Sequence, residues 1–337
     1  MTQHSRDGEV GTGELLREKS IERADDVGAQ YEIPAPELHG SFGALKDRIR
    51  HHYEMASDYY YSLWGEHIHH GYFTSPEDTK EQAQIRLIEL LLERSGLPAG
   101  SSVLDVGCGI GGTSRYLAAQ HGSAVVGVTI SGRQVEMARK LTLEACRGQA
   151  GTEEGSVGLG SGSARFVELD AERMGEYFSA AGTPHGPTTF DGVWISEALS
   201  HLPDKALFFA NAAKLLNPGG RLVVADWFKA EELTPEQLKA DITPIEDGML
   251  LPPLCTQSEY VDLAARAGLK TLSPPFDISK QVSKTWDISW SLVQSPALWA
   301  FAVAQGRDGL AFLQAFRAMR RGYANGTFRY AVMAFQN

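Results

Sequence analysis

The sequence predicts an α/β fold built on a doubly wound, mainly parallel sheet. The first observation is that short apolar runs alternate with segments of helical periodicity through the middle of the chain. The second is a glycine-rich turn, residues 107–112, that directly follows the first apolar run. Because parallel strands are joined by crossover helices, this alternation is typical of a sheet covered by helices on both faces.

Two predicted helices precede the sheet. Residues 42–64 suit a helix with aromatic positions, and a second helix follows Pro76, carries aliphatic residues at helical spacing and ends near Gly96. The alternating region comes next. Strands are predicted within residues 101–109, 124–131, 164–170, 189–196 and 217–227, and helices within residues 113–122, 132–145 and 204–216.

Two segments interrupt the alternation. Residues 148–163 are rich in glycine and serine and predict a flexible surface loop. Residues 230–299 are rich in proline and tryptophan and predict a cap over the sheet, and the chain closes with a helix, an Asn-Gly turn and a strand at 327–335. The expected organisation is a loose tail (1–40), a helical lid (41–98), a core (99–229), a substrate cap (230–300) and a C-terminal completion of the core (301–337).

Composition excludes several classes of protein. The chain has 337 residues, with 31 basic and 42 acidic side chains and a formal net charge of −11. No basic stripe is visible in it, which argues against a nucleic-acid binder and against stable anchoring on anionic membranes. Without an apolar run of about 20 residues or a secretory leader, the expected location is the cytoplasm.

The glycine-rich turn indicates the kind of ligand. Gly107, Gly109 and Gly111 allow a tight turn and a close approach of the backbone to a ligand. Such glycines also occur in dinucleotide-binding folds. Asp105, two residues before the first glycine, distinguishes the two cases, because its carboxylate can accept from a cationic amine but would repel a pyrophosphate. The turn therefore suits S-adenosylmethionine better than NAD.

Several longer motifs carry a family resemblance. VLDVGCGIGGTSRYLA, LWGEHIHHGYF, VTISGRQVEMAR, FDGVWISEALSHLPDKA and LNPGGRLVVADW together resemble class I S-adenosylmethionine-dependent methyltransferases, nearest to the γ-tocopherol methyltransferase group. Sterol C-methyltransferases and cyclopropane-fatty-acid synthases are more distant. The resemblance implies a Rossmann-like, seven-stranded sheet with an N-terminal lid and a cap inserted after strand five.

The resemblance also assigns cofactor-binding positions. Thr129 and Gln134 are expected at the ribose and Ile130 at the adenine face, while Asp170 is expected either at the adenine edge or as a helix N-cap. The full set of cofactor-binding candidates is Tyr53, His70, Asp105, Gly107, Gly109, Gly111, Thr129, Ile130, Gln134, Asp170, Ala171 and Ser196.

The segment GEHIHHGYF raises the possibility of a metal site at His67, His69 and His70. A metal site needs further ligands, and the sequence has no other His/Cys/Asp cluster with ligand spacing. The resemblance instead places this segment in the lid, so no metal is expected.

The exit of the fourth strand supplies the catalytic candidates. His201 is the expected general base and Glu197 the second titratable group, although Ser200 stands where the tocopherol enzymes have a glutamate. The expected substrate pocket consists of Tyr72, Trp227, Leu251, Trp286 and Trp290, some of which could instead form the core of the cap.

The predicted function is methyl transfer from S-adenosylmethionine to O, N or C of a small hydrophobic metabolite, by a monomer or homodimer. Two alternatives stay open: a cyclase or pericyclase on the same scaffold, and a non-enzymatic sensor of S-adenosylmethionine. Formation of S-adenosylhomocysteine on turnover separates the methyltransferase from both.

Overall fold

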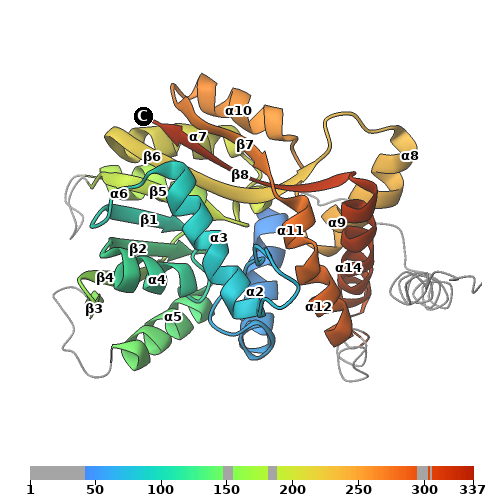
Figure 1. Cartoon of the computed structure of the whole chain (residues 1–337), viewed down its shortest axis with the longest axis horizontal. Helices are drawn as coiled ribbons and strands as arrows, with labels where there is room; N and C mark the ends of the chain where they lie inside the picture. The colour runs from blue at the N-terminus through green and yellow to red at the C-terminus, as the bar shows by residue number, and fades with distance from the viewer. Residues whose placement is uncertain (1–41, 147–154, 181–187, 294–302, 304–305) are drawn as a thin grey trace, which may run out of the picture.

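The computed structural model in Figure 1 describes residues 42–146, 155–180, 188–293, 303 and 306–337. The tail predicted at residues 1–40 lies outside the described residues. In the part that is described, no helix is long and apolar enough to cross a membrane.

The described strands form one mixed sheet in the order β3-β4-β2-β1-β5-β6-β8-β7. Its centre is parallel, with neighbouring strands β4, β2, β1, β5 and β6, and β8 runs antiparallel to both β6 and β7. The predicted doubly wound α/β fold is thereby confirmed. The strands are β1 (Ser102–Val106), β2 (Ala124–Thr129), β3 (Val157–Leu159), β4 (Gly162–Glu168), β5 (Phe190–Ser196), β6 (Leu216–Lys229), β7 (Lys270–Asp277) and β8 (Phe328–Gln336).

The sheet has eight strands rather than the expected seven, and two of them correct the sequence analysis. The segment predicted as a flexible loop contributes β3, which pairs antiparallel with β4 because Val157 and Leu159 are buried and can pack against the core. Part of the predicted cap, residues 257–277, forms helix α10 (Gln257–Arg266) and β7, which joins the sheet beside β8.

Helices cover both faces of the sheet. Because successive side chains of a strand point to opposite faces, Val103 packs into one core cluster and Leu104 into the other. The first cluster is completed by α3 (Lys80–Ser95), α4 (Gly112–His121) and α5 (Gly132–Ala145), and the second by α6 (Met174–Ser179), α7 (Lys205–Leu215) and α10.

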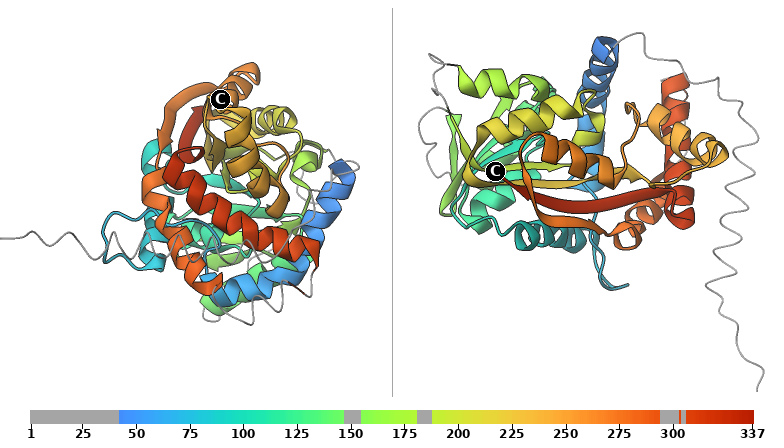
Figure 2. Two further views of the ribbon diagram at one scale, coloured as in Figure 1. Left: turned by 90° about the vertical axis from the view of Figure 1, so that its right-hand side faces the viewer. Right: turned by 90° about the horizontal axis from the view of Figure 1, so that it is seen from above.

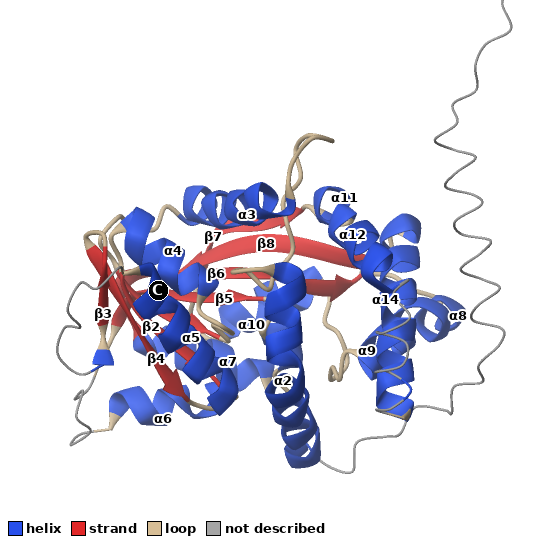
Figure 3. Cartoon of the chain, turned by 90° about the horizontal axis from the view of Figure 1, so that it is seen from below, coloured by secondary structure: helices blue, strands red, loops and turns tan. Residues whose placement is uncertain are grey.

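A further helical layer stands at the edge where the parallel strands end. Helix α2 (Phe42–Trp64) lies between the sheet and the pair formed by α9 (Thr243–Gly248) and α14 (Arg307–Asn325), as the views in Figures 2 and 3 show. The short helices α8 (Pro235–Gln237), α11 (Ser279–Val282) and α12 (Lys284–Val293) lie at the same end of the molecule. Open α/β sheets bind ligands at the carboxyl ends of their strands, so this layer covers the expected site.

Candidate active site

A cleft lies over the carboxyl ends of β1, β2 and β5, and we call it the glycine-loop cleft. It continues past Gly107 and Gly109 to the buried side chain of Asp105. The sequence-predicted residues that line it are Tyr53, Asp105, Gly107, Gly109, Thr129, Ile130, Gln134, Asp170, Ala171 and Ser196.

The glycines of the loop have different tasks. Gly107 has φ +74°, and a Cβ atom there would lie 2.3 Å from the Cβ of Ala198, so this position needs glycine for packing. Gly109 has φ +54°, and its Cβ would meet no heavy atom within 4 Å, which leaves open space beside the backbone. Gly111 does not line the cleft but precedes α4, where a Cβ would come within 2.6 Å of the Phe166 ring.

Asp105 places a carboxyl group at one end of the cleft. Its side chain is buried, and the hydroxyl of Ser114 donates to Oδ2 over 2.5 Å. Burial raises the pKa of Asp105 to about 6, although the hydrogen bond from Ser114 lowers this pKa in part. A buried carboxylate with one neutral partner is a site that a cationic group of a ligand would stabilise.

Thr129 and Gln134 come together at the end of β2. The Thr129 hydroxyl donates to Gln134 Oε1 over 2.6 Å, and the Ser131 hydroxyl caps α5 by accepting from the Gln134 backbone N–H at 3.2 Å. The polar end of this pair lies in the wall of the cleft, where it can bind hydroxyl groups.

Asp170 performs the capping task and also lines the cleft. Its Oδ1 accepts from the backbone N–H of Glu172 at 3.0 Å, and its Oδ2 accepts from Lys46 Nζ at 2.8 Å. Lys46 also pairs with the Glu172 carboxylate. Lys46 belongs to α2 and lines the cleft as well, but the sequence analysis missed it because nothing near it in sequence indicates this contact.

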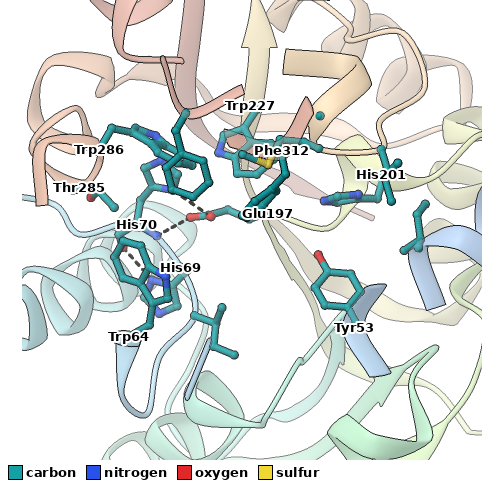
Figure 4. Close-up of a pocket in the computed structure, with 16 residues that line it drawn as sticks. Tyr53, Trp64, His69, His70, Glu197, His201, Trp227, Thr285, Trp286 and Phe312 are labelled. Carbon is teal, nitrogen blue, oxygen red and sulfur yellow. Dashed lines mark hydrogen bonds and ion pairs between the residues drawn. The ribbon is translucent and has the colours of Figure 1, made fainter. Parts of the chain in front are cut away.

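A second cavity, the aromatic pocket, adjoins the cleft (Figure 4). Trp227 and Trp286, two of the residues expected in the substrate pocket, line it. Leu251 does not line the pocket but is buried in the first core cluster, and Tyr72 packs against the same cluster. Leu250, the neighbour of Leu251, lines the pocket instead. The side chain of Trp290 lies outside the described residues. Further lining side chains are Trp64, Met249, Phe312 and Phe316.

The cleft and the pocket share part of their walls. Ile49, Tyr53, Ile68, Glu197 and His201 line both cavities, and we call these five residues the junction. A ligand in the cleft and a ligand in the pocket would therefore meet beside one carboxylate and one imidazole.

Glu197 is the most constrained residue of the junction. It follows β5 with φ +56°, a conformation that costs a non-glycine residue about 1–3 kcal/mol. Its Oε1 accepts from the backbone N–H of His70 at 2.7 Å and from the Tyr330 hydroxyl at 2.8 Å, while Oε2 contacts His70 Nδ1 at 2.9 Å. Burial alone would raise the pKa of Glu197, but electrostatic attraction to His70 and His69 and the hydrogen bonds from His70 outweigh burial and hold the pKa below its usual value.

The three histidines of residues 67–70 lie close to one another: the ring centroids of His67 and His69 are 5.2 Å apart, and His69 lines the aromatic pocket together with His70. His70 lines the aromatic pocket, not the cleft in which the sequence analysis expected it. Burial lowers the pKa of His67 to about 3, helped by the charges of His69 and Arg115. Among the described residues, no group of three His, Cys, Asp or Glu side chains could hold a metal ion.

The chemistry of the cleft fits S-adenosylmethionine. Asp105 offers an acceptor for an amino group, and the open space beside Gly109 is a cradle that any Cβ would fill. Thr129 and Gln134 offer polar atoms that could bind ribose hydroxyls, and Asp170 and Ala171 line the same cleft.

Comparison with known proteins agrees with this fit. Residues 44–150 match the family described as mycolic acid cyclopropane synthetase, and residues 104–222 match a methyltransferase domain. The chain is 30% identical over 307 residues to a probable chloroplastic tocopherol O-methyltransferase of Oryza sativa, covering 86% of this chain and 77% of the relative.

Two further similarities extend the comparison. The 27-O-demethylrifamycin SV methyltransferase of Amycolatopsis mediterranei is 31% identical over 235 residues, covering 69% of this chain and 77% of the relative. The cyclopropane synthase MmaA2 of Mycobacterium tuberculosis has the same fold, with a TM-score of 0.67, 20% identity and coverage of 89% of this chain and 100% of that one. The chain thus belongs to the class I S-adenosylmethionine-dependent methyltransferases, in the group that contains the tocopherol methyltransferases.

Proposed function

We propose that this methyltransferase acts on a hydroxyl oxygen of a small, apolar molecule bound in the aromatic pocket. The observation that carries the proposal is the junction, whose five residues line both the glycine-loop cleft and the aromatic pocket. Two of the relatives above are named for methylation at oxygen, which favours oxygen over nitrogen or carbon as the acceptor atom.

The walls of the aromatic pocket suit an apolar acceptor. Indole and phenyl rings from four different elements converge on it, contributed by Trp64, Trp227, Trp286 and Phe312. Such walls bury apolar surface, and a few polar groups then orient the ligand. Here those polar groups include the Glu197 carboxylate and the imidazoles of His69, His70 and His201.

S-adenosylmethionine supplies an electrophilic methyl group when it is bound, so the main tasks of the protein are alignment and exclusion of water. Holding two reactants in near-attack geometry can account for about 7–11 kcal/mol of a barrier. Ile49 and Ile68 form apolar walls of the junction, and Glu197 and His201 are two of its polar side chains.

The proposal is tested with methyl-labelled S-adenosylmethionine and a panel of apolar phenols and secondary alcohols that includes γ-tocopherol. We expect S-adenosylhomocysteine to form together with a product one methyl group heavier. A rearranged product without S-adenosylhomocysteine would favour the cyclase alternative, and tight cofactor binding without any turnover would favour the sensor. Methylation confined to amines or to carbon would contradict the choice of oxygen.

A further inference from the structure

We propose that His70, held by Glu197, is the base that removes the proton from the acceptor hydroxyl. The inference rests on the proposed O-methylation and adds to it the residue that handles the proton, a role that the sequence analysis assigned to His201. It starts from a contact between residues 127 positions apart in the chain.

Glu197 fixes both the position and the tautomer of His70. The carboxylate accepts from the backbone N–H of His70 at 2.7 Å, and its other oxygen lies 2.9 Å from Nδ1 of the ring. Because an ionised carboxylate can only accept, Nδ1 must carry the hydrogen in this contact. Nε2 of the neutral ring is then left with its lone pair, which is the state of a general base.

Nε2 of His70 lacks a hydrogen-bond partner among the described residues, although it is buried. Buried polar atoms are nearly always paired, and exceptions often mark a catalytic atom or a ligand site. The ring lines the aromatic pocket and is enclosed by the rings of Trp227 and Trp286, with centroid distances of 5.9 and 5.3 Å. An acceptor hydroxyl in the pocket would supply the missing donor.

Four aromatic rings pack against the ring of His70. The ring centroids of Tyr330 from β8 and Tyr323 from α14 lie 5.0 and 6.4 Å from that of His70. Burial, and to a smaller extent the charge of Glu197, raises the pKa of both phenols well above the usual value. They are therefore neutral. Trp227 from β6 and Trp286 from α12 contribute uncharged indoles. Within the described part of the chain, the ionised group in hydrogen-bond contact with His70 is Glu197, whose negative charge would stabilise an imidazolium.

His69 provides an internal comparison. Its Nδ1 lies 2.8 Å from the carbonyl oxygen of His70, and its Nε2 also lacks a partner among the residues that the structure describes. Burial lowers the pKa of His69, and the charge of Glu197 only partly opposes this. His69 can therefore accept a hydrogen bond but holds a proton poorly.

His201, the residue first expected to be the base, is a member of the junction and lies near the rings of Tyr53 and Trp227. Its ring lies 6.2 Å from that of Tyr53 and 6.0 Å from that of Trp227, measured between centroids. It borders the cleft as well as the pocket, so it can orient the two reactants. The carboxylate of Glu197, in contrast, is hydrogen-bonded to His70.

In the proposed step the acceptor O–H bond breaks, and its proton moves to Nε2 of His70. The electron pair of the oxygen forms the bond to the methyl carbon, and the bond from that carbon to sulfur breaks with its electrons remaining on sulfur. The products are the methyl ether, S-adenosylhomocysteine and an imidazolium that donates through Nδ1 to Glu197. The imidazolium then releases its proton to solvent.

The first test needs no acceptor. Nitrogen NMR of the full chain labelled with ¹⁵N-histidine, with His70 assigned from the His70→Asn variant, should show hydrogen on Nδ1 and none on Nε2 at pH 8. Hydrogen on both nitrogens at the pH of turnover would overturn the proposal, because the ring would then have no lone pair to use. This result is independent of whether the protein methylates oxygen.

The second test compares His70→Asn with the same substitution at His69 and His201. Asparagine can still donate to Glu197 but has no atom in place of Nε2. Using the phenol turned over fastest by the native enzyme, we expect His70→Asn to lower kcat by about 10²–10⁴-fold and to remove the acid limb of the pH–rate profile. Affinity for S-adenosylhomocysteine, measured by calorimetry, should change less than about threefold, which also shows that the variant is folded.

The control variants should keep the acid limb, with kcat reduced about tenfold or less. The proposal is overturned if His70→Asn keeps the acid limb, or if the large loss appears in His201→Asn instead. Glu197→Gln, which removes the charge and keeps the shape, should lower kcat in the same direction as His70→Asn; full activity in that variant would also contradict the role of the pair. If no phenol or alcohol is turned over, the proposed function fails while the NMR result still stands.

Discussion

Replacing Asp105 by asparagine should make the protein more stable and less able to bind its cofactor. Burial raises the pKa of this carboxyl from 3.8 to about 6, so its ionised form is disfavoured in the fold. Since a pKa shift of one unit corresponds to about 1.36 kcal/mol, keeping Asp105 ionised lowers the stability of the fold by about 3 kcal/mol above pH 7. The amide of asparagine is uncharged and can still accept from Ser114.

The sign of the pH dependence follows from the same shift. Between pH 6 and pH 4 the folded protein takes up a proton at Asp105 that the unfolded chain does not yet bind, so the native protein gains stability from this group as the pH falls. The advantage of Asp105→Asn should therefore be about 3 kcal/mol at pH 7.5 and shrink to about 1 kcal/mol at pH 4.5.

Urea unfolding of both proteins at the two pH values measures this difference, and calorimetry with S-adenosylmethionine measures the affinity. Loss of a hydrogen bond between charged groups corresponds to about 1.5–3 kcal/mol, so the dissociation constant should rise about 10–100-fold. For the native protein the affinity should fall about tenfold per pH unit below pH 6. Equal stability at pH 7.5 together with unchanged affinity would refute the assignment of Asp105 as a buried, ligand-binding carboxylate.

Three further predictions concern the loop, the pocket and the histidine cluster. Gly107→Ala should lower the melting temperature sharply, because the new Cβ would lie 2.3 Å from the Cβ of Ala198. Gly109→Ala should fold but lose affinity for S-adenosylhomocysteine, because its new Cβ would project into open space of the cleft. Trp286→Ala should raise KM for the acceptor about tenfold while cofactor affinity stays within about threefold, since this indole lines the aromatic pocket and not the cleft. Dialysis against a strong chelator should leave methyl transfer intact, because no group of three His, Cys, Asp or Glu side chains among the described residues could hold a metal ion. Activity that is lost and then restored by zinc would contradict this expectation.

Most residues that line the glycine-loop cleft could be predicted to lie together because their determinants are local. Asp105, Gly107 and Gly109 lie within five residues, and Thr129 meets Gln134 across one turn of the helix that Ser131 caps. Strand, turn and helix preferences set such short-range geometry, so it can be recognised in the sequence. The alternation of strands and helices predicted the doubly wound sheet in the same way. The strands β3 and β7 were missed because β3 has only three residues and β7 lacks a regular alternation of buried and exposed residues.

The aromatic pocket and its surroundings depend on contacts between distant parts of the chain. Glu197 meets His70 and Tyr330 across 127 and 133 residues, and Lys46 meets Asp170 across 124. No sequence pattern reports such pairs, because they arise only when α2, the segment around His70, the exit of β5 and β8 pack against one another. The sequence by itself determined the fold, the family and the cofactor through local preferences. Only the tertiary structure decided which histidine faces a carboxylate, because that depends on how separate elements pack against each other.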